Sequence, residues 1–106
     1  MFYELRQYPV KPGQMDAWVA YMEGTIIPFQ VSHGMVITGS YRGEEDDSVY
    51  VWMRRFESEE QRLALYKAVY ENDRWRDEIS PIVATLIDRT GIQVTRIVPT
   101  PLSVAQ

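Results

Sequence analysis

The sequence predicts a single α+β domain whose elements follow one another in the order β-α-β-β-α-β. Four short segments carry the side-chain pattern of strands, and two longer segments repeat apolar side chains at helical spacing. Glycine or proline separates most of these segments. The chain has 106 residues and contains no internal repeat or linker, so residues 1–106 are expected to form one domain.

The first part of the chain predicts one strand followed by one long helix. Side chains alternate over residues 2–10, and a Pro-Gly turn at Gly13 ends this strand. The next segment repeats apolar residues at helical spacing, namely Met15, Trp18, Val19, Met22 and Ile26. We expect Pro28 to kink or restart this helix and Gly34 to end it in a left-handed conformation.

The three remaining strands are predicted over residues 35–42, 48–56 and 92–98. The first two are rich in β-branched and aromatic residues and flank the acidic loop 43–47, so they form a hairpin. The complete order of elements is the ferredoxin-like arrangement, in which a four-stranded antiparallel sheet carries its helices on one face.

The second helical region is predicted in pieces. Ser58 and Gln61 have the spacing of a capping box, which predicts a helix from Ser58 to about Tyr70. Asp73 is expected to cap a following segment, and Ser80 to begin a third one with proline in its first helical position.

Both faces of the predicted sheet are expected to be covered. Leu5 and Tyr8 on the first strand, and Val51 and Trp52 on the third, are apolar or aromatic on opposite faces, whereas a sheet with one face in water alternates strictly. We therefore expect a homodimer sealed by the helix-free faces of two sheets.

Composition and charge exclude several classes of function. The net charge of −4, with no basic run, argues against nucleic-acid binding, and no apolar run is long enough for a membrane span. The chain has no cysteine and one histidine, so neither a metal site nor a cofactor is expected; His33, beside a glycine turn, is not expected to ligate haem. No secretory signal is evident, and we expect a cytoplasmic location.

Several motifs along the chain resemble those of the NIPSNAP family. They are Tyr3-Glu4-Leu5-Arg6-Gln7-Tyr8, Lys11-Pro12-Gly13, Trp18, His33-Gly34, Trp52, Asn72-Asp73-Arg74-Trp75 and Pro99-Thr100-Pro101. The resemblance spans nearly the whole chain and implies a dimeric α+β barrel. Other barrels of this kind include cofactor-independent monooxygenases and haem-degrading enzymes, which bind ligands between helices and sheet.

Aromatic and arginine side chains form the candidate site. The ligand-binding candidates are Arg6, Tyr8, His33, Trp52, Arg54, Tyr66 and Trp75. The candidates for catalysis are His33, Tyr3 and Trp52. The aromatic residues can equally belong to the core, and the two arginines can pair with Glu4 and Glu57, with the opposite subunit or with a carboxylated ligand, since a buried guanidinium needs a partner.

Three functions stay open from the sequence. The first is a NIPSNAP-like homodimer that binds a small organic molecule in the helix–sheet cleft. The second is a cofactor-independent monooxygenase or isomerase of an aromatic substrate, with tyrosines, tryptophan and His33 transferring protons. The third is a non-catalytic interaction module. His33 itself is interpreted as part of a helix end, with a catalytic role as the alternative.

Overall fold

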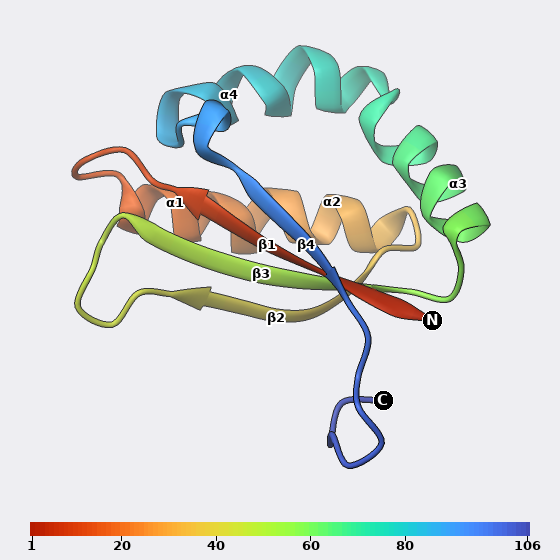
Figure 1. Ribbon diagram of the computed structural model, residues 1–106. Helices are drawn as coiled ribbons and strands as arrows, with labels where there is room; N and C mark the ends of the chain where they lie inside the picture. Colours follow the sequence, from red (N-terminus) through yellow and green to blue (C-terminus); the bar gives the residue numbers. More distant parts are fainter.

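The computed structural model describes residues 1–106 and contains a four-stranded antiparallel sheet with all helices on one face (Figure 1). The strands lie in the order β2-β3-β1-β4. Their bounds are Phe2–Pro9 for β1, Val36–Arg42 for β2, Val49–Phe56 for β3 and Gln93–Ile97 for β4. The predicted α+β fold with ferredoxin-like order is confirmed.

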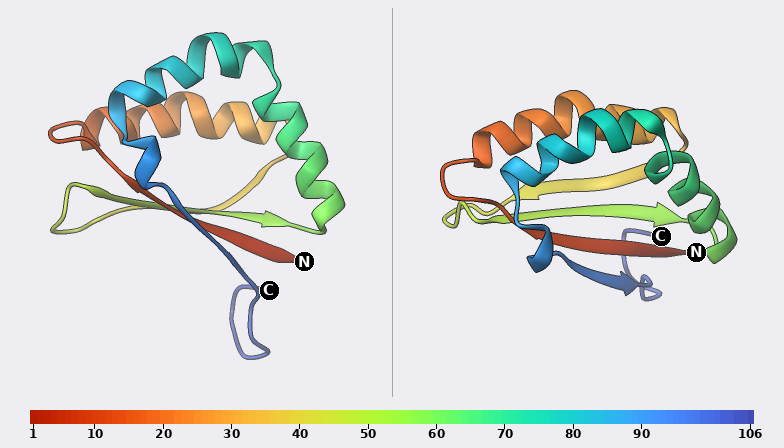
Figure 2. Two further views of the ribbon diagram at one scale, coloured as in Figure 1. Left: turned by 45° about the horizontal axis from the view of Figure 1, so that its top comes forward. Right: turned by 90° about the horizontal axis from the view of Figure 1, so that it is seen from above.

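Two helical regions form the layer above the sheet, as the two views in Figure 2 show. The first contains α1 (Met15–Tyr21), a π turn (Met22–Ile26) and α2 (Ile27–Ser32). The second contains α3 (Glu59–Tyr70), a π turn (Trp75–Ile79), α4 (Ser80–Leu86) and a short 3₁₀ turn (Arg89–Gly91). No helix combines the length and the apolar character that a membrane crossing requires.

The two π turns explain how both helical regions accommodate a proline. In the first turn the N–H of Ile27 donates to the carbonyl of Met22, and in the second the N–H of Ser80 donates to the carbonyl of Trp75. The next residue is proline in both cases. A proline ring clashes with the carbonyl four residues earlier in a regular α-helix, and the wider π turn relieves that clash. The first helix therefore restarts as α2 without leaving its path.

The helix ends are largely those that the sequence predicts. Gly34 has φ +103°, and its N–H and that of Met35 donate to the carbonyls of Val31 and Gln30 in a Schellman arrangement. The hydroxyl of Ser58 accepts from the N–H of Gln61 at 3.0 Å, which caps α3.

One predicted cap is displaced by a residue. Asn72, and not Asp73, caps the segment after α3, because the Oδ1 atom of Asn72 accepts from the N–H of Arg74 at 2.8 Å. Asp73 instead pairs with Arg76 on the helix surface. Both residue types are favoured at this position, so the sequence alone does not separate them.

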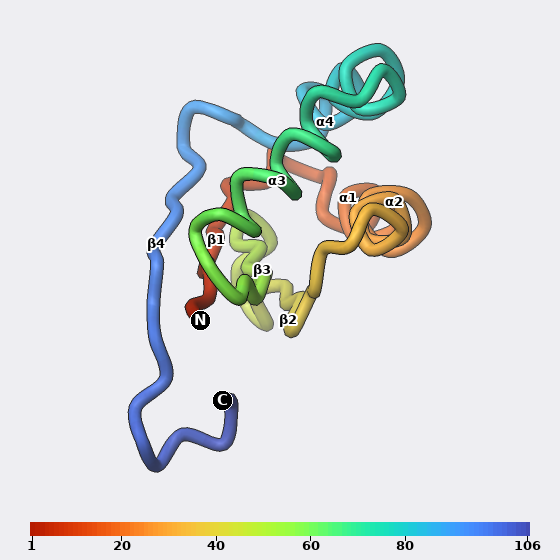
Figure 3. The backbone as a smooth tube through the Cα atoms, turned by 90° about the vertical axis from the view of Figure 1, so that its right-hand side faces the viewer, coloured from red at the N-terminus to blue at the C-terminus, as the bar shows by residue number.

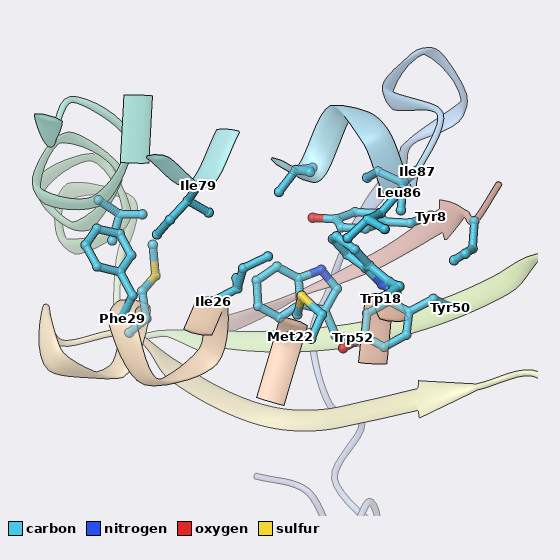
Figure 4. Packing of buried hydrophobic residues seen from close by; sticks show 14 of the residues in the cluster. Tyr8, Trp18, Met22, Ile26, Phe29, Tyr50, Trp52, Ile79, Leu86 and Ile87 are labelled. Atoms are coloured by element: carbon cyan, nitrogen blue, oxygen red, sulfur yellow. The ribbon is translucent and has the colours of Figure 1, made fainter. Parts of the chain in front are cut away.

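The two faces of the sheet differ in what covers them. The side chains that point to the helices are Phe2, Glu4, Arg6 and Tyr8 of β1 and Tyr50, Trp52, Arg54 and Phe56 of β3. They meet the apolar side of the helices in one core, part of which Figure 4 shows. On the opposite face, Leu5 lies across from Met53, and both are half-buried.

The C-terminal residues 98–106 extend below the helix-free face of the sheet (Figures 1 and 3). Val98, Leu102 and Val104 are apolar and exposed. The hydroxyl of Tyr3 donates to the carbonyl of Gln106 at 3.2 Å and so ties the end of the chain to β1.

Candidate functional site

A cavity of about 80 Å³ lies between the helical layer and the sheet. Thirteen residues line it, and ten of them are hydrophobic or aromatic; the other three are Arg6, Gln30 and Arg89. The wall draws on β1, β3 and both helical regions, including residues of both π turns. Such a cavity has room for a few water molecules or a small organic group, because one water needs about 10–15 Å³.

Two indole rings in the cavity wall have unused hydrogen-bond donors. Trp18 and Trp52 are each 1% exposed, and the Nε1 atom of neither ring has a hydrogen-bond partner in the protein. Figure 4 shows both rings packed together with Tyr8 between the helices and the sheet. Buried polar groups are nearly always paired, and each unpaired one needs an explanation. Both rings contribute to the cavity lining, but their Nε1 atoms themselves are enclosed by the surrounding side chains.

A buried ion pair stands next to the cavity. Arg54 donates through Nη2 to Glu4 at 2.8 Å and to Tyr66 at 2.7 Å, and through Nη1 to Gln30 at 3.0 Å and Tyr70 at 2.6 Å. The Tyr66 hydroxyl in turn donates to both carboxylate oxygens of Glu4. Only the Nε atom of Arg54 lacks a partner. This network fixes the side of the cavity formed by β1, β3 and α3.

Arg6 brings a second guanidinium to this network. Its Nε atom donates to Tyr8 at 2.8 Å and its Nη1 atom to Tyr66 at 3.2 Å. Its only carboxylate neighbour is Glu4, at 3.7 Å, and Glu4 already binds Arg54. Arg62 lies 3.8 Å from the same carboxylate, so three guanidiniums share Glu4 and the network carries an excess of positive charge.

The pKa values in the network reflect this charge balance. Burial alone would raise the pKa of Glu4, but the hydrogen bond from Tyr66 and the charge and hydrogen bond of Arg54 outweigh burial and lower it. Burial is the main cause that raises the pKa of Tyr66 to about 12 and also raises that of Tyr8. At neutral pH, therefore, Glu4 is ionised, the phenols of Tyr8 and Tyr66 are neutral, and the guanidiniums of Arg6 and Arg54 are charged.

The structure distributes the sequence-based candidates over three places. Arg6, Tyr8, Trp52 and Trp75 line the cavity. Arg54 and Tyr66 lie behind the wall and form the network described above. His33 and Tyr3 lie outside the cavity lining.

His33 occupies the C-cap position of α2. Its ring packs edge-on against Phe29, with 4.8 Å between the ring centroids. The ring makes no hydrogen bond to a backbone carbonyl, so it contributes to the helix end by packing. Tyr3 is on the helix-free face, as its strand parity predicts.

Nine of the thirteen lining residues are missing from the sequence-based candidates. Those among the nine that carry a polar group are Trp18, Gln30, Tyr70 and Arg89. The sequence offers a hint for Gln30, because this polar residue follows Ile26 by four positions and so falls on the buried side of the helix. No sequence pattern indicates Arg89, because only the 3₁₀ turn after α4 brings it to the cavity. No group of three or more His, Asp or Glu side chains is placed to hold a metal ion.

Comparison with known proteins relates the whole chain to one family. The NIPSNAP family model matches residues 3–103. A NIPSNAP family protein of known structure from Agrobacterium tumefaciens is 25% identical to the chain, with a TM-score of 0.89 over 100% of this chain and 94% of the other. A second one from the same bacterium is 21% identical, with a TM-score of 0.87 over 99% and 98%.

The same fold extends to a more distant protein. The structure of an antibiotic biosynthesis monooxygenase is 12% identical, with a TM-score of 0.67 over 95% of this chain and 100% of the other. At this identity the likeness concerns the fold alone. Among curated proteins, the sequence comparison finds no match.

Proposed function

Since the chain belongs to the NIPSNAP family, we propose that it is a homodimer that binds a small organic molecule in the cavity between its helices and its sheet. The observation that carries this proposal is the cavity itself, whose wall combines ten hydrophobic or aromatic residues with Arg6, Gln30 and Arg89. Pockets that bind small organic molecules are mostly apolar and carry a few polar groups of this kind.

The geometry supports binding better than the two other functions. A cavity with polar groups in its wall is a feature that a pure interaction module does not need. An oxygenase or isomerase of an aromatic substrate needs a base beside the substrate, and His33 lies outside the lining while Glu4 is engaged by Arg54 and Tyr66. The volume of about 80 Å³ is also small for a polycyclic substrate.

The proposed homodimer would form through the helix-free face of the sheet. Leu5, Val51 and Met53 place apolar side chains on the side without helices. The C-terminal segment lies beneath that side (Figure 3), and its residue Leu102 is exposed. A second copy that docks there would remove this surface from water. Sedimentation equilibrium at micromolar concentration is expected to give twice the chain mass, and a stable monomer would contradict the proposal. A cytoplasmic location belongs to the same proposal, and cell fractionation tests it.

Ligand binding can be tested through the tryptophans themselves. The three tryptophans give three indole N–H signals in a ¹H–¹⁵N NMR spectrum, and a panel of small organic fragments is expected to shift those of Trp18 and Trp52. Val83→Phe should abolish these shifts because Val83 lines the cavity.

A matched control lies next to that position. Ile82→Phe adds a similar bulk on the exposed side of α4 and should preserve the fragment-induced shifts. Thermal unfolding of both variants shows that each is folded. The proposal fails if no fragment moves the two indole signals, or if Val83→Phe responds as the wild type does.

A further inference from the structure

We infer that the C-terminal segment, residues 98–106, crosses to a second copy of this chain and places Leu102 and Val104 on the helix-free face of that copy's sheet. This inference rests on the proposed homodimer and names a contact that holds it together. It follows from the shape of the segment, from the lack of charge in it, and from the composition of the face.

The C-terminal segment is a loop with both ends tied to Tyr3. Ile97, the residue before the segment, lies opposite Tyr3 in the sheet, and the carbonyl of Gln106 accepts from the Tyr3 hydroxyl at 3.2 Å. Within the loop the N–H of Ser103 donates to the carbonyl of Thr100 at 3.0 Å. A loop that already has its shape loses little conformational freedom when it docks.

The loop presents apolar side chains that its own chain leaves uncovered. Leu102 is 97% exposed, and Val104 is fully exposed. No charged residue occurs from Ile97 to Gln106, although 25% of the residues in the chain are charged. The centre of a protein–protein interface is depleted of charge in the same way. The loop thus has the composition of a surface that another protein covers.

The helix-free face has a matching composition. Its residues lie opposite one another across the strands in three rows of four, which run from Val36 to Ile97, from Gly39 to Thr95 and from Tyr41 to Gln93. Arg55 is the only charged residue in these rows, and it pairs with Glu57. Val36 and Tyr41 are large, apolar or aromatic, and exposed. The face therefore offers the loop an almost uncharged surface with apolar side chains.

The loop and the face lie on the same side of the molecule (Figures 1 and 3), and a second copy is the partner that fits both. In a two-fold dimer each copy supplies the same patch, so each of the two facing sheets receives one loop. A different protein would have to offer both an uncharged loop and an uncharged face of its own. The two-fold arrangement covers both features with no further component.

The double variant with Leu102→Ser and Val104→Ser tests the contact by sedimentation equilibrium. The dissociation constant of the dimer should rise at least about a hundredfold, because four apolar side chains per dimer lose their burial. Neither side chain packs within its own chain, so the variant should fold as the wild type does. Circular dichroism shows whether it is folded.

A matched control removes two apolar side chains from the helical layer. Val31 and Leu63 are exposed on α2 and α3, away from the helix-free face. The double variant with Val31→Ser and Leu63→Ser should leave the dissociation constant within about threefold of the wild-type value.

A spin label tests where the loop lies and leaves Leu102 and Val104 in place. The chain has no cysteine, so a label on Ala105→Cys attaches at one position. In a mixture with ¹⁵N-enriched wild-type chains, this label is expected to broaden the amide signals of β1 and β3 in the enriched chains, because the enriched chains carry no label themselves. A label on Leu63→Cys in the helical layer should broaden them less. This measurement carries the test if the double serine variant does not fold.

The outcomes separate this inference from the proposed homodimer. If the wild type is a dimer and the loop variant dissociates no more readily than the control variant, the dimer forms without the loop and the inference is wrong. It is also wrong if the label on Ala105→Cys broadens signals of the helical layer in place of those of the sheet. If the wild type sediments as a monomer, the homodimer itself is wrong and the inference fails with it.

Discussion

Glu4 and Arg54 lie directly opposite each other on β1 and β3, and their side chains form an ion pair of 2.8 Å under the helical layer. The guanidinium is completely buried, and the carboxylate nearly so. This pair joins the two central strands of the sheet, and the tyrosines that bond to it extend the network to α3.

Removal of the Glu4 charge is expected to destabilise the protein strongly. Glu4→Gln leaves the buried guanidinium without its counter-charge, and the free energy of unfolding should fall by about 3 kcal/mol in urea titrations. The exposed pair of Arg55 and Glu57 is the control. Glu57→Gln should change the free energy of unfolding by less than about 0.5 kcal/mol. Similar losses in both variants would show that burial does not govern the strength of the pair.

A double substitution is expected to recover part of that loss. In Glu4→Gln with Arg54→Met no unpaired charge remains buried, so the double variant should be more stable than the sum of the two single losses by at least about 1 kcal/mol. The double-mutant cycle measures this coupling directly. Additive losses would mean that the two side chains stabilise the fold independently.

The same pair predicts a dependence of stability on pH. The pKa of Glu4 in the folded protein lies below its ordinary value of 4.5. Its contribution is therefore complete above pH 4.5 and is lost as the pH falls through the folded-state pKa. Between pH 5 and 3 the wild type should lose stability more steeply than Glu4→Gln. Glu59, whose pKa the hydrogen bond from Arg62 lowers to about 2, adds to both slopes equally. Parallel slopes would contradict the prediction.

Two glycines of the first helical region should respond to alanine in opposite ways. Gly34 has φ +103°, and a Cβ atom there would lie 3.0 Å from Leu65, so Gly34→Ala should cost about 1–2 kcal/mol. Gly24 lies inside the π turn with open space around it, so Gly24→Ala should stabilise the helix by about 0.5 kcal/mol. Melting temperatures test both, and a stabilising Gly34→Ala would refute the positive-φ argument.

His33 is expected to matter for stability alone, and only slightly. Its ring contacts Phe29 at the end of α2 and lies outside the cavity lining. His33→Asn should cost about 1 kcal/mol or less and leave the fragment-induced shifts of the indole signals unchanged. Lost binding at an unchanged melting temperature would assign the histidine a functional role instead.

Features that depend on neighbours in the sequence are the ones that the sequence predicts well. The helix start at Ser58 and the helix stop at Gly34 follow from local hydrogen bonds and backbone preference. Strand parity also separates Tyr3 from the side of the sheet that bears Arg6 and Tyr8.

Features that depend on contacts between residues far apart in the chain could not be predicted from the sequence. In the sequence, Gln30 is simply a polar residue within a helix. The structure shows that Arg54, 24 positions later, donates a hydrogen bond to it. The indoles of Trp18 and Trp52 read as core residues, and only the packed structure reveals that their N–H groups lack partners. Arg89 reaches the cavity through the turn after α4, which no pattern marks.

The π turns also bear on how these helices tolerate insertion and deletion. Trp18, Met22, Ile26 and Gln30 follow one another at intervals of four, and all are buried. In a regular α-helix three such intervals would rotate Gln30 about 120° away from Trp18, and one additional residue accounts for about 100° of that rotation. The first π turn is therefore equivalent to a one-residue insertion that leaves the inward face intact.

That insertion is coupled to the proline that follows it. Deletion of Gly24 alone would return the segment to a regular α-helix with Pro28 in its interior, at a cost of about 3 kcal/mol. Deletion of Gly24 together with Pro28→Ala would keep the same side chains facing the sheet without that cost. The additional residue and the proline are thus energetically coupled, because removal of the residue alone places the proline inside a regular α-helix.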